Sequence, residues 1–397
     1  MTLNHSTSLL LNFGHALDHM FLLIFATAVT SIALEFGFAQ WEDLMPFSAG
    51  AFLLFGIGSV PARRLGDLWG RRSMMVIFFF GMGAAALLCA TVQNAWQMAA
   101  ALALLGAFAS IYHPVGIPML VQHARKPGTT IGINGLAGNL GIAFAAILTG
   151  FMVKYIGWRA AFVVPALLSF ACGLVFMRVA PAEAEPPAKR NSKASVRLSP
   201  QMLARLFVVM TFAAISSSLL FNFTTNGNGQ LMRERFAGVV DDPAHLGIML
   251  AGVYLVASFA QVVVGRLIDR YPLKHLYLGM VLLQIPMLLL AAYAQGWSLF
   301  WLQIGFMVAI FGAIPFTDAM LVRYVDDAIR WRVSGMRLAV SFGISSLAVY
   351  ALGPAVKAAG FTTLLLVMAA IAGCTAAFVL MLPAEMASSE SPSKSPA

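Results

Sequence analysis

The chain has 397 residues, of which 60% are hydrophobic and only 10% are charged, and its formal net charge is +9. This composition excludes an ordinary soluble globule of the same length and is typical of a protein that crosses a membrane many times. The function therefore has to be sought in the polar residues that interrupt the apolar stretches.

Twelve apolar stretches divide the chain, and each can cross the hydrocarbon as a helix, which needs about 20 residues. The first stretch lacks the basic flank and small-residue cleavage site of a signal peptide, so we expect it to be retained. The fold class that follows is an all-α membrane protein with twelve transmembrane helices. In chain order the predicted helices cover residues 8–34, 43–61, 74–92, 97–122, 129–153, 158–179, 205–228, 246–265, 276–295, 298–322, 333–356 and 361–382.

The basic residues are distributed unevenly between the two sides of the membrane. An even number of helices places both termini on one side, and if that side is the cytoplasm, 20 of the 25 Lys and Arg residues lie on the cytoplasmic side. This bias obeys the positive-inside rule. We therefore predict a multi-pass protein of the cell membrane, the inner membrane in a bacterium, with cytoplasmic termini, the lipid bilayer as its surroundings and no nucleic-acid partner.

Motifs of enzyme chemistry are absent from the sequence. There is no G-x-x-x-x-G-K-S/T nucleotide loop and no nucleophile elbow, and the three cysteines, Cys89, Cys172 and Cys374, fall inside predicted helices. An odd number of thiols within the membrane gives no basis for a disulfide framework or a metal cluster. We predict that the protein is not an enzyme and has no cofactor.

A charged motif occurs twice, at loops that the topology makes equivalent. Residues 63–72 read RRLGDLWGRR, and residues 265–274 read GRLIDRYPLK, with Asp67 and Asp269 separated by 202 positions. A repeat at this spacing argues for two six-helix halves related by an axis along the membrane normal.

A second repeat supports the same division. Lys154-x-x-Gly157-Trp158 returns as Lys357-x-x-Gly360-Phe361 at an offset of 203. The stretch between the halves is rich in Pro, Ser and Lys, which is typical of a solvated linker. The predicted domains are an N-terminal bundle (1–180), a cytoplasmic linker (181–204), a C-terminal bundle (205–383) and a disordered cytoplasmic tail (384–397).

At these motifs the chain resembles the major facilitator superfamily over essentially its whole length. The resemblance implies transport of a small molecule by alternating access, in which two bundles rock around a central site. It also places Asp67 against the start of the eleventh helix and Asp269 against the start of the fifth. The alternative is that these charges only orient the loops. The candidate gating residues in the two motifs are Asp67, Arg71, Arg72, Asp269 and Arg270.

A narrower resemblance lies in the fourth predicted helix. Tyr112-His113-Pro114, followed by a glycine-rich fifth helix, is similar to the fosmidomycin-resistance branch of that superfamily, which consists of efflux carriers. In that branch a His-Pro dipeptide in helix four accompanies a His and an Asp in helix one, matched here by His113, His15 and Asp18. The resemblance therefore implies efflux.

Ionisable residues inside the first helix indicate how transport is driven. His15, Asp18 and His19 share one face, because they are spaced i, i+3 and i+4. A charged Asp near mid-membrane costs about 2.5–3.5 kcal/mol, so it is seldom placed there without a partner or cavity. His113 lies at a similar depth, and a neighbouring carboxylate can move a histidine across physiological pH. We predict a proton and substrate site that includes these four residues and Tyr112.

Other interpretations of the same residues stay open. Each histidine could be a packing residue whose nitrogens are satisfied locally. Two imidazoles at i, i+4, with Asp18 and His113, could also clamp a transition metal, although we expect no bound metal. The alternative functions are accordingly a transition-metal or small-solute importer of the same fold, or a non-transporting membrane sensor or assembly protein.

The second half is polar but largely uncharged in its membrane-embedded part. Asn222 and Asn226, with several Ser and Thr residues, lie in the seventh predicted helix and suit a neutral or zwitterionic solute. Asp318 in the tenth helix is followed by Arg323, and we predict an ion pair there with a structural or gating role. We expect the protein to act as a monomer.

Overall fold

In a computed structural model the chain forms an all-helical bundle, and the structure describes residues 5–122, 124, 127–181, 200–325 and 327–382. Within these residues, 11 helical segments are long and apolar enough to cross a membrane. Large apolar side chains such as Val60 (74% exposed) and Trp96 (77% exposed) cover the outside of the bundle. Such a surface fits contact with lipid, because water would leave these side chains without an apolar neighbour.

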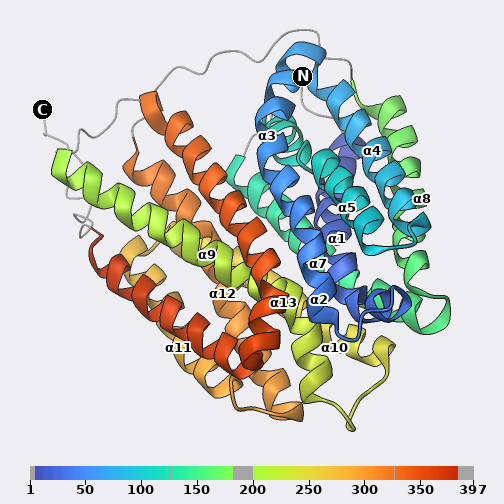
Figure 1. The fold of residues 1–397 in the computed structure, drawn as a ribbon. Coiled ribbons are helices and arrows are strands. Elements are labelled where there is room, and N and C mark those ends of the chain that lie inside the picture. The colour runs from blue at the N-terminus through green and yellow to red at the C-terminus, as the bar shows by residue number, and fades with distance from the viewer. Residues whose placement is uncertain (1–4, 123, 125–126, 182–199, 326, 383–397) are drawn as a thin grey trace, which may run out of the picture.

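The described residues of the first half form eight helices and two short turns of other helix types. Most elements cluster on one side of the molecule, from blue to green in Figure 1. They are α1 (His5–Glu35), α2 (Trp41–Leu44), η1 (Met45–Ser48), α3 (Ala49–Trp69), α4 (Arg71–Thr91), α5 (Ala95–Ala109), η2 (Tyr112–Gly116), α6 (Ile117–Val121), α7 (Pro127–Tyr155) and α8 (Trp158–Val179).

The second half forms the other side of the molecule, from lime to red in Figure 1. Its elements are α9 (Pro200–Arg235), α10 (Pro243–Ile268), α11 (Leu273–Ala291), α12 (Gly296–Tyr324) and α13 (Asp327–Leu380). We call the end of the molecule where α1 ends and α7 meets α8 the distal end. The opposite end, where α1 begins, is the proximal end.

Several helix limits differ from the predicted ones. The first charged motif was predicted as a loop but is mostly helical. Helix α3 continues through Asp67 to Trp69, and only Gly70 (φ 85°) interrupts the helical backbone before α4. Likewise α9 runs to Arg235, beyond the predicted limit of 228. Hydropathy marks only the part of a helix that lies in hydrocarbon, whereas Arg, Leu and Met continue a helix readily into water.

The predicted eleventh and twelfth helices are joined in α13, which accounts for the difference between twelve predicted and 11 observed segments. Inside α13, Gly360 has φ 73° and ψ 168°, which are not helical dihedrals. The end of the predicted linker 181–204 is helical, because α9 already begins at Pro200. The rest of the linker, apart from residue 181, and the predicted tail 384–397 lie outside the described residues.

The fourth predicted helix is not continuous. It divides into α5, a wide π-type turn η2 that contains His113, and α6. Pro114 and Pro118 have no backbone N–H to donate, so regular helical bonding cannot pass through this stretch. Wide turns of this kind often occur at functional sites, and here the turn presents two aromatic side chains to α1.

Candidate central site

Asp18 is the one Asp, Glu, Lys or Arg that is buried in the described part of the chain. Its side chain is 0% exposed, and neither carboxylate oxygen has a hydrogen-bond partner among the described residues. The nearest basic atom is Nε2 of His113, 3.7 Å from Oδ2. The structure therefore brings together the carboxylate of helix one and the imidazole of helix four that the sequence had placed at one depth.

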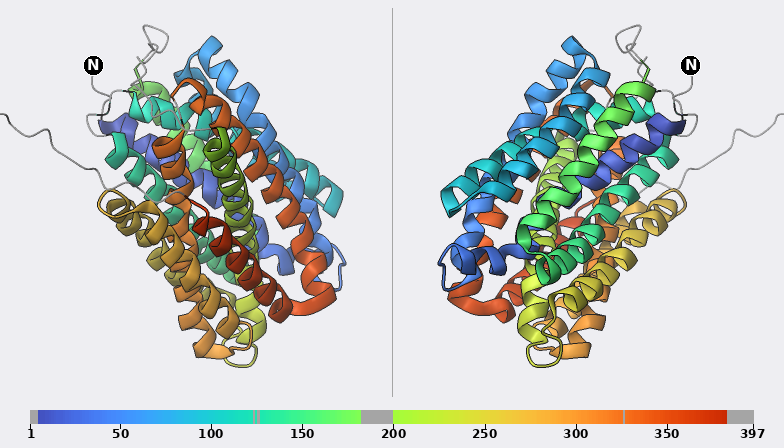
Figure 2. Two further views of the ribbon diagram at one scale, coloured as in Figure 1. Left: turned by 90° about the vertical axis from the view of Figure 1, so that its left-hand side faces the viewer. Right: turned by 90° about the vertical axis from the view of Figure 1, so that its right-hand side faces the viewer.

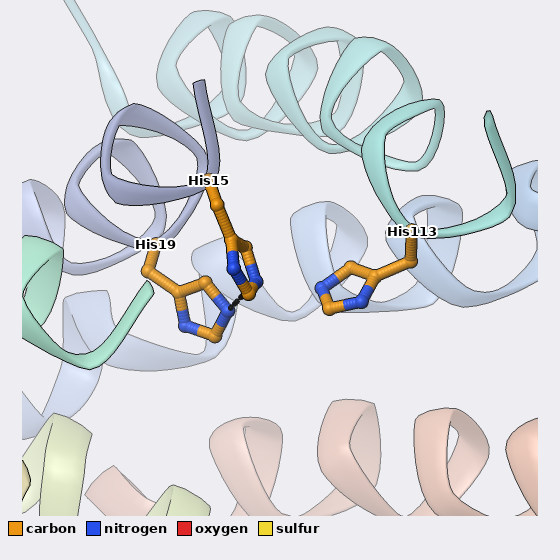
Figure 3. Close-up of side chains that lie close together, drawn as sticks. All are labelled: His15, His19 and His113. Carbon is orange, nitrogen blue, oxygen red and sulfur yellow. Dashed lines mark hydrogen bonds between the residues drawn. The ribbon is translucent and has the colours of Figure 1, made fainter. Parts of the chain in front are cut away.

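The three histidines of the site form a compact group, with His15 between the other two in Figure 3. Nδ1 of His15 lies 2.7 Å from the carbonyl oxygen of Asn134, and its Nε2 lies 3.1 Å from Nε2 of His19. A carbonyl can only accept, so His15 carries its proton on Nδ1 and, when neutral, accepts at Nε2. His19 must then donate through Nε2–H, which fixes the direction of the chain of hydrogen bonds.

Tyr112 packs against the face of the His15 ring. The two rings stack with centroids 4.7 Å apart and an interplanar angle of 9°. The Tyr112 hydroxyl donates to the carbonyl of Leu11 (2.7 Å) and accepts from Nδ2 of Asn134 (2.7 Å). Two hydrogen bonds hold the Tyr112 hydroxyl in place. The position of His15 is therefore set by the Tyr112 ring as well as by Asn134.

Asn134 and Gly138 of α7 complete this arrangement; sequence reasoning missed Asn134 and included Gly138 only among the glycines of the fifth helix. Asn134 also donates to Oδ1 of Asn12, at 3.0 Å. A Cβ added at Gly138 would lie only 2.7 Å from Cε1 of His15, so only glycine lets the imidazole occupy its place. Asn134 and Asn139 are the only amides predicted in the fifth helix, which was the one available signal.

Phe55 of α3 closes the site on the side of the second half. Its ring lies 5.7 Å from the His113 ring and 5.0 Å from that of Phe342 in α13. Gly56, the next residue of α3, would place a Cβ 2.3 Å from Cβ of Phe342. The central site is therefore bounded by a direct contact between the two halves.

The same cluster has the composition of a possible metal site. One nitrogen from each of His15, His19 and His113 lies within 4.8 Å of the other two. Zinc is held by such nitrogens at about 2.0–2.1 Å. In this structure, however, the His15 and His19 nitrogens meet in a direct hydrogen bond, which is the arrangement that a shared proton needs.

The predicted polar residues of the second half lie on α9 and are buried. Nδ2 of Asn222 donates to the Ser345 hydroxyl at 2.8 Å, and Nδ2 of Asn226 donates to the Asn222 carbonyl at 3.0 Å. Oδ1 of Asn226 has no partner among the described residues. No hydrogen bond between described residues links these amides to the histidines, so the two groups are separate in this conformation.

The candidate gating residues lie at the proximal end. Asp67, Asp269 and Arg270 are exposed, and no ion pair joins either Asp to a residue whose side chain is described. Arg72 donates to the carbonyls of Ala180 (2.9 Å) and Met177, so it caps the end of α8.

The structure describes only some of the side chains in the remaining gating predictions, which concern Arg71, Asp318 and Arg323. Arg71 donates to Oε1 of Gln122 at 3.0 Å. Asp318 is exposed on α12, whereas the side chain of its predicted partner Arg323 lies outside the described residues. The eleventh and fifth predicted helices were expected to face Asp67 and Asp269 with their first residues. There too, some of the side chains lie outside the described residues.

Comparison with known proteins identifies the family. A sequence profile described as Major Facilitator Superfamily matches residues 10–233. The chain belongs to the Major Facilitator Superfamily. It is thus a multi-pass membrane protein from a family of transporters that carry small molecules across membranes.

Individual relatives agree with this assignment. "Multidrug resistance protein MdtG" of Yersinia enterocolitica is 24% identical over 306 residues, which cover 74% of this chain and 71% of the relative. The protein of that name from Enterobacter lignolyticus is 26% identical over 305 residues, with the same coverage. These relatives are bacterial, which is consistent with the predicted inner membrane.

Solved structures show the same fold at low sequence identity. A bacterial homolog of the human lysosomal transporter Spinster, in an inward-facing and unoccupied conformation, superimposes with a TM-score of 0.76. The match covers 95% of this chain and 96% of that chain, at 14% sequence identity. At this identity the likeness shows the fold alone.

Proposed function

We propose that the protein is a secondary active transporter that exports a small molecule in exchange for protons, by alternating access to one central site. The names of the multidrug resistance relatives support the direction of transport, and so does the resemblance of His15, Asp18 and His113 to the fosmidomycin-resistance branch. The protein then works as a monomeric transporter and has no enzymatic step.

The proposed topology has twelve spans. Val340–Leu380 contains 41 residues. A straight helix of this length would be about 60 Å long at 1.5 Å per residue, twice the roughly 30 Å of hydrocarbon. The chain reverses direction within α13, as the orange and dark red ribbons of Figure 2 show, which supports two spans that meet at Gly360. The positive-inside bias then places the proximal end in the cytoplasm.

The observation that carries proton coupling is the environment of Asp18. Its charge has no hydrogen-bond donor in this conformation, and His113 is 3.7 Å away. A buried carboxylate without donors costs several kcal/mol, so the group must hold a proton or share one with an imidazole. When the bundles rock, water reaches the site and the proton can leave, which couples proton release to conformation.

The remaining predicted residues have roles in the same cycle. His15, His19 and Tyr112 relay or orient the proton, and Asn222 and Asn226 contact a neutral or zwitterionic substrate when the halves come together around it. The charges at the proximal end act as a cytoplasmic gate. These gating residues are Asp67, Arg71, Arg72, Asp269, Arg270, Asp318 and Arg323.

The test uses Asp18→Asn, which keeps the size of the side chain and removes its titration. The parent protein is first expressed in an efflux-deficient bacterium and challenged with a panel of antibacterial compounds. For each compound to which it gives resistance, everted vesicles carrying a pH-sensitive dye report proton release. We expect Asp18→Asn to abolish this release, while Asp241→Asn, a change at an exposed loop residue, retains it. Unchanged substrate-driven proton release in the Asp18 variant would refute proton coupling at this site.

One observation favours a second candidate, a transition-metal importer. The nitrogens of His15, His19 and His113 are close enough to converge on one ion. Metal analysis of the purified protein decides between the two. We expect no stoichiometric metal, and His113→Gln should lose pH-dependent flux only. Stoichiometric Zn, Cu, Fe or Mn that disappears in His15 and His113 variants would favour the importer.

A further inference from the structure

Two ion pairs join the halves of the molecule at the distal end. Lys154, near the end of α7, contacts Oδ2 of Asp242, which caps the start of α10. Nζ of Lys357 in α13 lies 2.6 Å from Oδ1 of Asp43 in α2. In the first pair the lysine comes from the N-terminal half, and in the second it comes from the C-terminal half.

The two lysines occupy equivalent positions in the repeat. Gly150, Lys154 and Gly157 recur at an offset of 203 as Gly353, Lys357 and Gly360. In both copies the last glycine has a positive φ, 122° at Gly157 and 73° at Gly360, and turns the chain into the next helical segment. Each lysine therefore occupies the equivalent position in its own half. Each also reaches the second span of the other half.

The glycine before each lysine has the same environment in both copies. A Cβ at Gly150 would lie 2.5 Å from the carbonyl oxygen of Pro243, the residue after Asp242. A Cβ at Gly353 would lie 2.1 Å from the carbonyl oxygen of Glu42, the residue before Asp43. At each point two backbones from different halves touch directly, which only glycine permits. A residue four positions later lies on the same helix face, so the lysine is aimed at the neighbouring Asp.

Other polar contacts between the halves lie close by. The Thr30 hydroxyl of α1 donates to Oε1 of Gln230 in α9 at 2.8 Å. Nε2 of Gln230 in turn lies 3.4 Å from the Ala26 carbonyl. The distal end is thus closed by several contacts that separation of the halves would break together.

We propose that the two Gly-x-x-x-Lys segments and their partners Asp242 and Asp43 form a clasp, repeated in both halves, that holds the distal side of the transporter shut. This inference rests on the proposed alternating access. Opening the distal side breaks both ion pairs, and each half contributes one lysine and one aspartate. The repeat relates the two ion pairs, so they lie on either side of the axis between the halves. Each pair therefore resists separation of the halves on its own side of that axis.

The size of the effect follows from the exposure of the four side chains, which are between 28% and 48% exposed. Ion pairs of this kind are worth about twofold to fivefold each in an equilibrium constant. The two pairs are separate, so their contributions to the free energy of opening add and the fold-changes multiply. Loss of both lysines should therefore increase the open population about fourfold to 25-fold.

The experiment measures distal opening directly. A reporter cysteine replaces Ser31, which lies about one turn before the end of α1 and lines a small cavity between the halves. The three native cysteines are replaced by serine or alanine, and the rate of maleimide labelling is followed in purified protein. The rate rises in proportion to the open population while opening is fast and rare.

The variants are Lys154→Gln, Lys357→Gln and both together. The matched control is Arg159→Gln, because Arg159 pairs with Glu35 at the same end but within one half. We expect the single variants to raise the labelling rate about twofold to fivefold and the double variant about fourfold to 25-fold, with the control unchanged. Exchange of charge, Lys357→Asp with Asp43→Lys, should restore the rate of the parent.

The outcomes separate this inference from the proposed function. If the double variant labels at the parental rate, or if Arg159→Gln changes the rate as much, the clasp does not hold the distal side and the inference is wrong. Size-exclusion profiles of the purified variants show that a change in labelling is not unfolding. A failure of proton coupling would appear only in the Asp18→Asn measurement and would leave the labelling result standing.

Discussion

Replacement of Gly138 by alanine tests whether close packing positions His15 in the proposed proton site. The added Cβ would lie 2.7 Å from Cε1 and 2.9 Å from both nitrogens of the His15 ring. Carbon atoms normally approach to about 3.5 Å, so the ring must move by roughly 0.8 Å. The hydrogen bond between Nδ1 of His15 and the Asn134 carbonyl, now 2.7 Å long, then lengthens beyond useful range.

The expected cost combines three contributions. Insertion of a methyl group into a packed interior costs about 1–3 kcal/mol, and the lost hydrogen bond costs about 0.5–1.5 kcal/mol. Alanine in a helix regains about 1 kcal/mol relative to glycine. The net destabilisation is therefore about 0.5–3.5 kcal/mol, and we expect flux driven by a pH gradient to fall by at least about tenfold, since small misplacements of reacting groups are costly.

Gly132→Ala is the matched control, because the same change in the same helix meets no atom within 4 Å. Thermal unfolding in detergent and flux in proteoliposomes are measured for both variants. We expect Gly132→Ala to unfold no earlier than the parent and to transport normally. If Gly138→Ala behaves like Gly132→Ala in both measurements, the position of His15 does not depend on this contact and the account of the site is wrong.

Three further predictions concern other parts of the molecule. Tyr112→Phe keeps the ring stack but removes two buried hydrogen bonds, so it should lower the unfolding temperature while retaining most flux, whereas Tyr112→Leu should lose flux as well. Asp67→Ala or Asp269→Ala should increase cysteine labelling along the fourth helix from the cytoplasmic side, and equal labelling would mean that these residues only shape the helix ends. The Lys154 hydrogen bond lowers the pKa of Asp242, with help from the backbone N–H groups of His245 and Ala244. The contribution of this ion pair is therefore present above about pH 4 and is lost only in stronger acid. Because Nδ1 of His245 lies 3.4 Å from Oδ1 of Asp242, the test is made in a His245→Gln background; distal labelling that changes there between pH 5 and 8, but not when Asp242→Asn is added, would contradict this.

Sequence spacing predicted which ionisable side chains of the first and fourth helices lie close together. The i, i+3, i+4 pattern puts His15, Asp18 and His19 on one face of α1, and a His-Pro dipeptide interrupts the fourth helix at the same depth. Asn134 could not be predicted, because its role depends on how α7 packs against α1. An uncharged amide in an apolar helix is usually a packing residue, and nothing in its neighbours along the chain distinguishes this one.

Helix limits were the less predictable part of the fold. The motif around Asp67 was assigned to a loop because its charges are costly in hydrocarbon, yet α3 continues through these residues to Trp69. Hydropathy detects where the membrane ends, and backbone hydrogen bonding decides where the helix ends. The same distinction explains why α9 begins at Pro200, inside the predicted linker.

The central site and the proposed distal clasp share one helix, α7, which links them mechanically. Asn134 and Gly138 position His15, and Gly150 and Lys154 lie 12 and 16 residues beyond Gly138, about 18 and 24 Å along the same helix. A Cβ at Gly141 would lie 2.0 Å from the Ala16 carbonyl, so α7 and α1 are packed backbone to backbone and must move together. Release of the clasp therefore cannot expose Asp18 by separating α1 from α7. In the proposed cycle, opening must instead change the other boundary of the site, where Phe55 contacts Phe342 across the halves, and so give water access to Asp18.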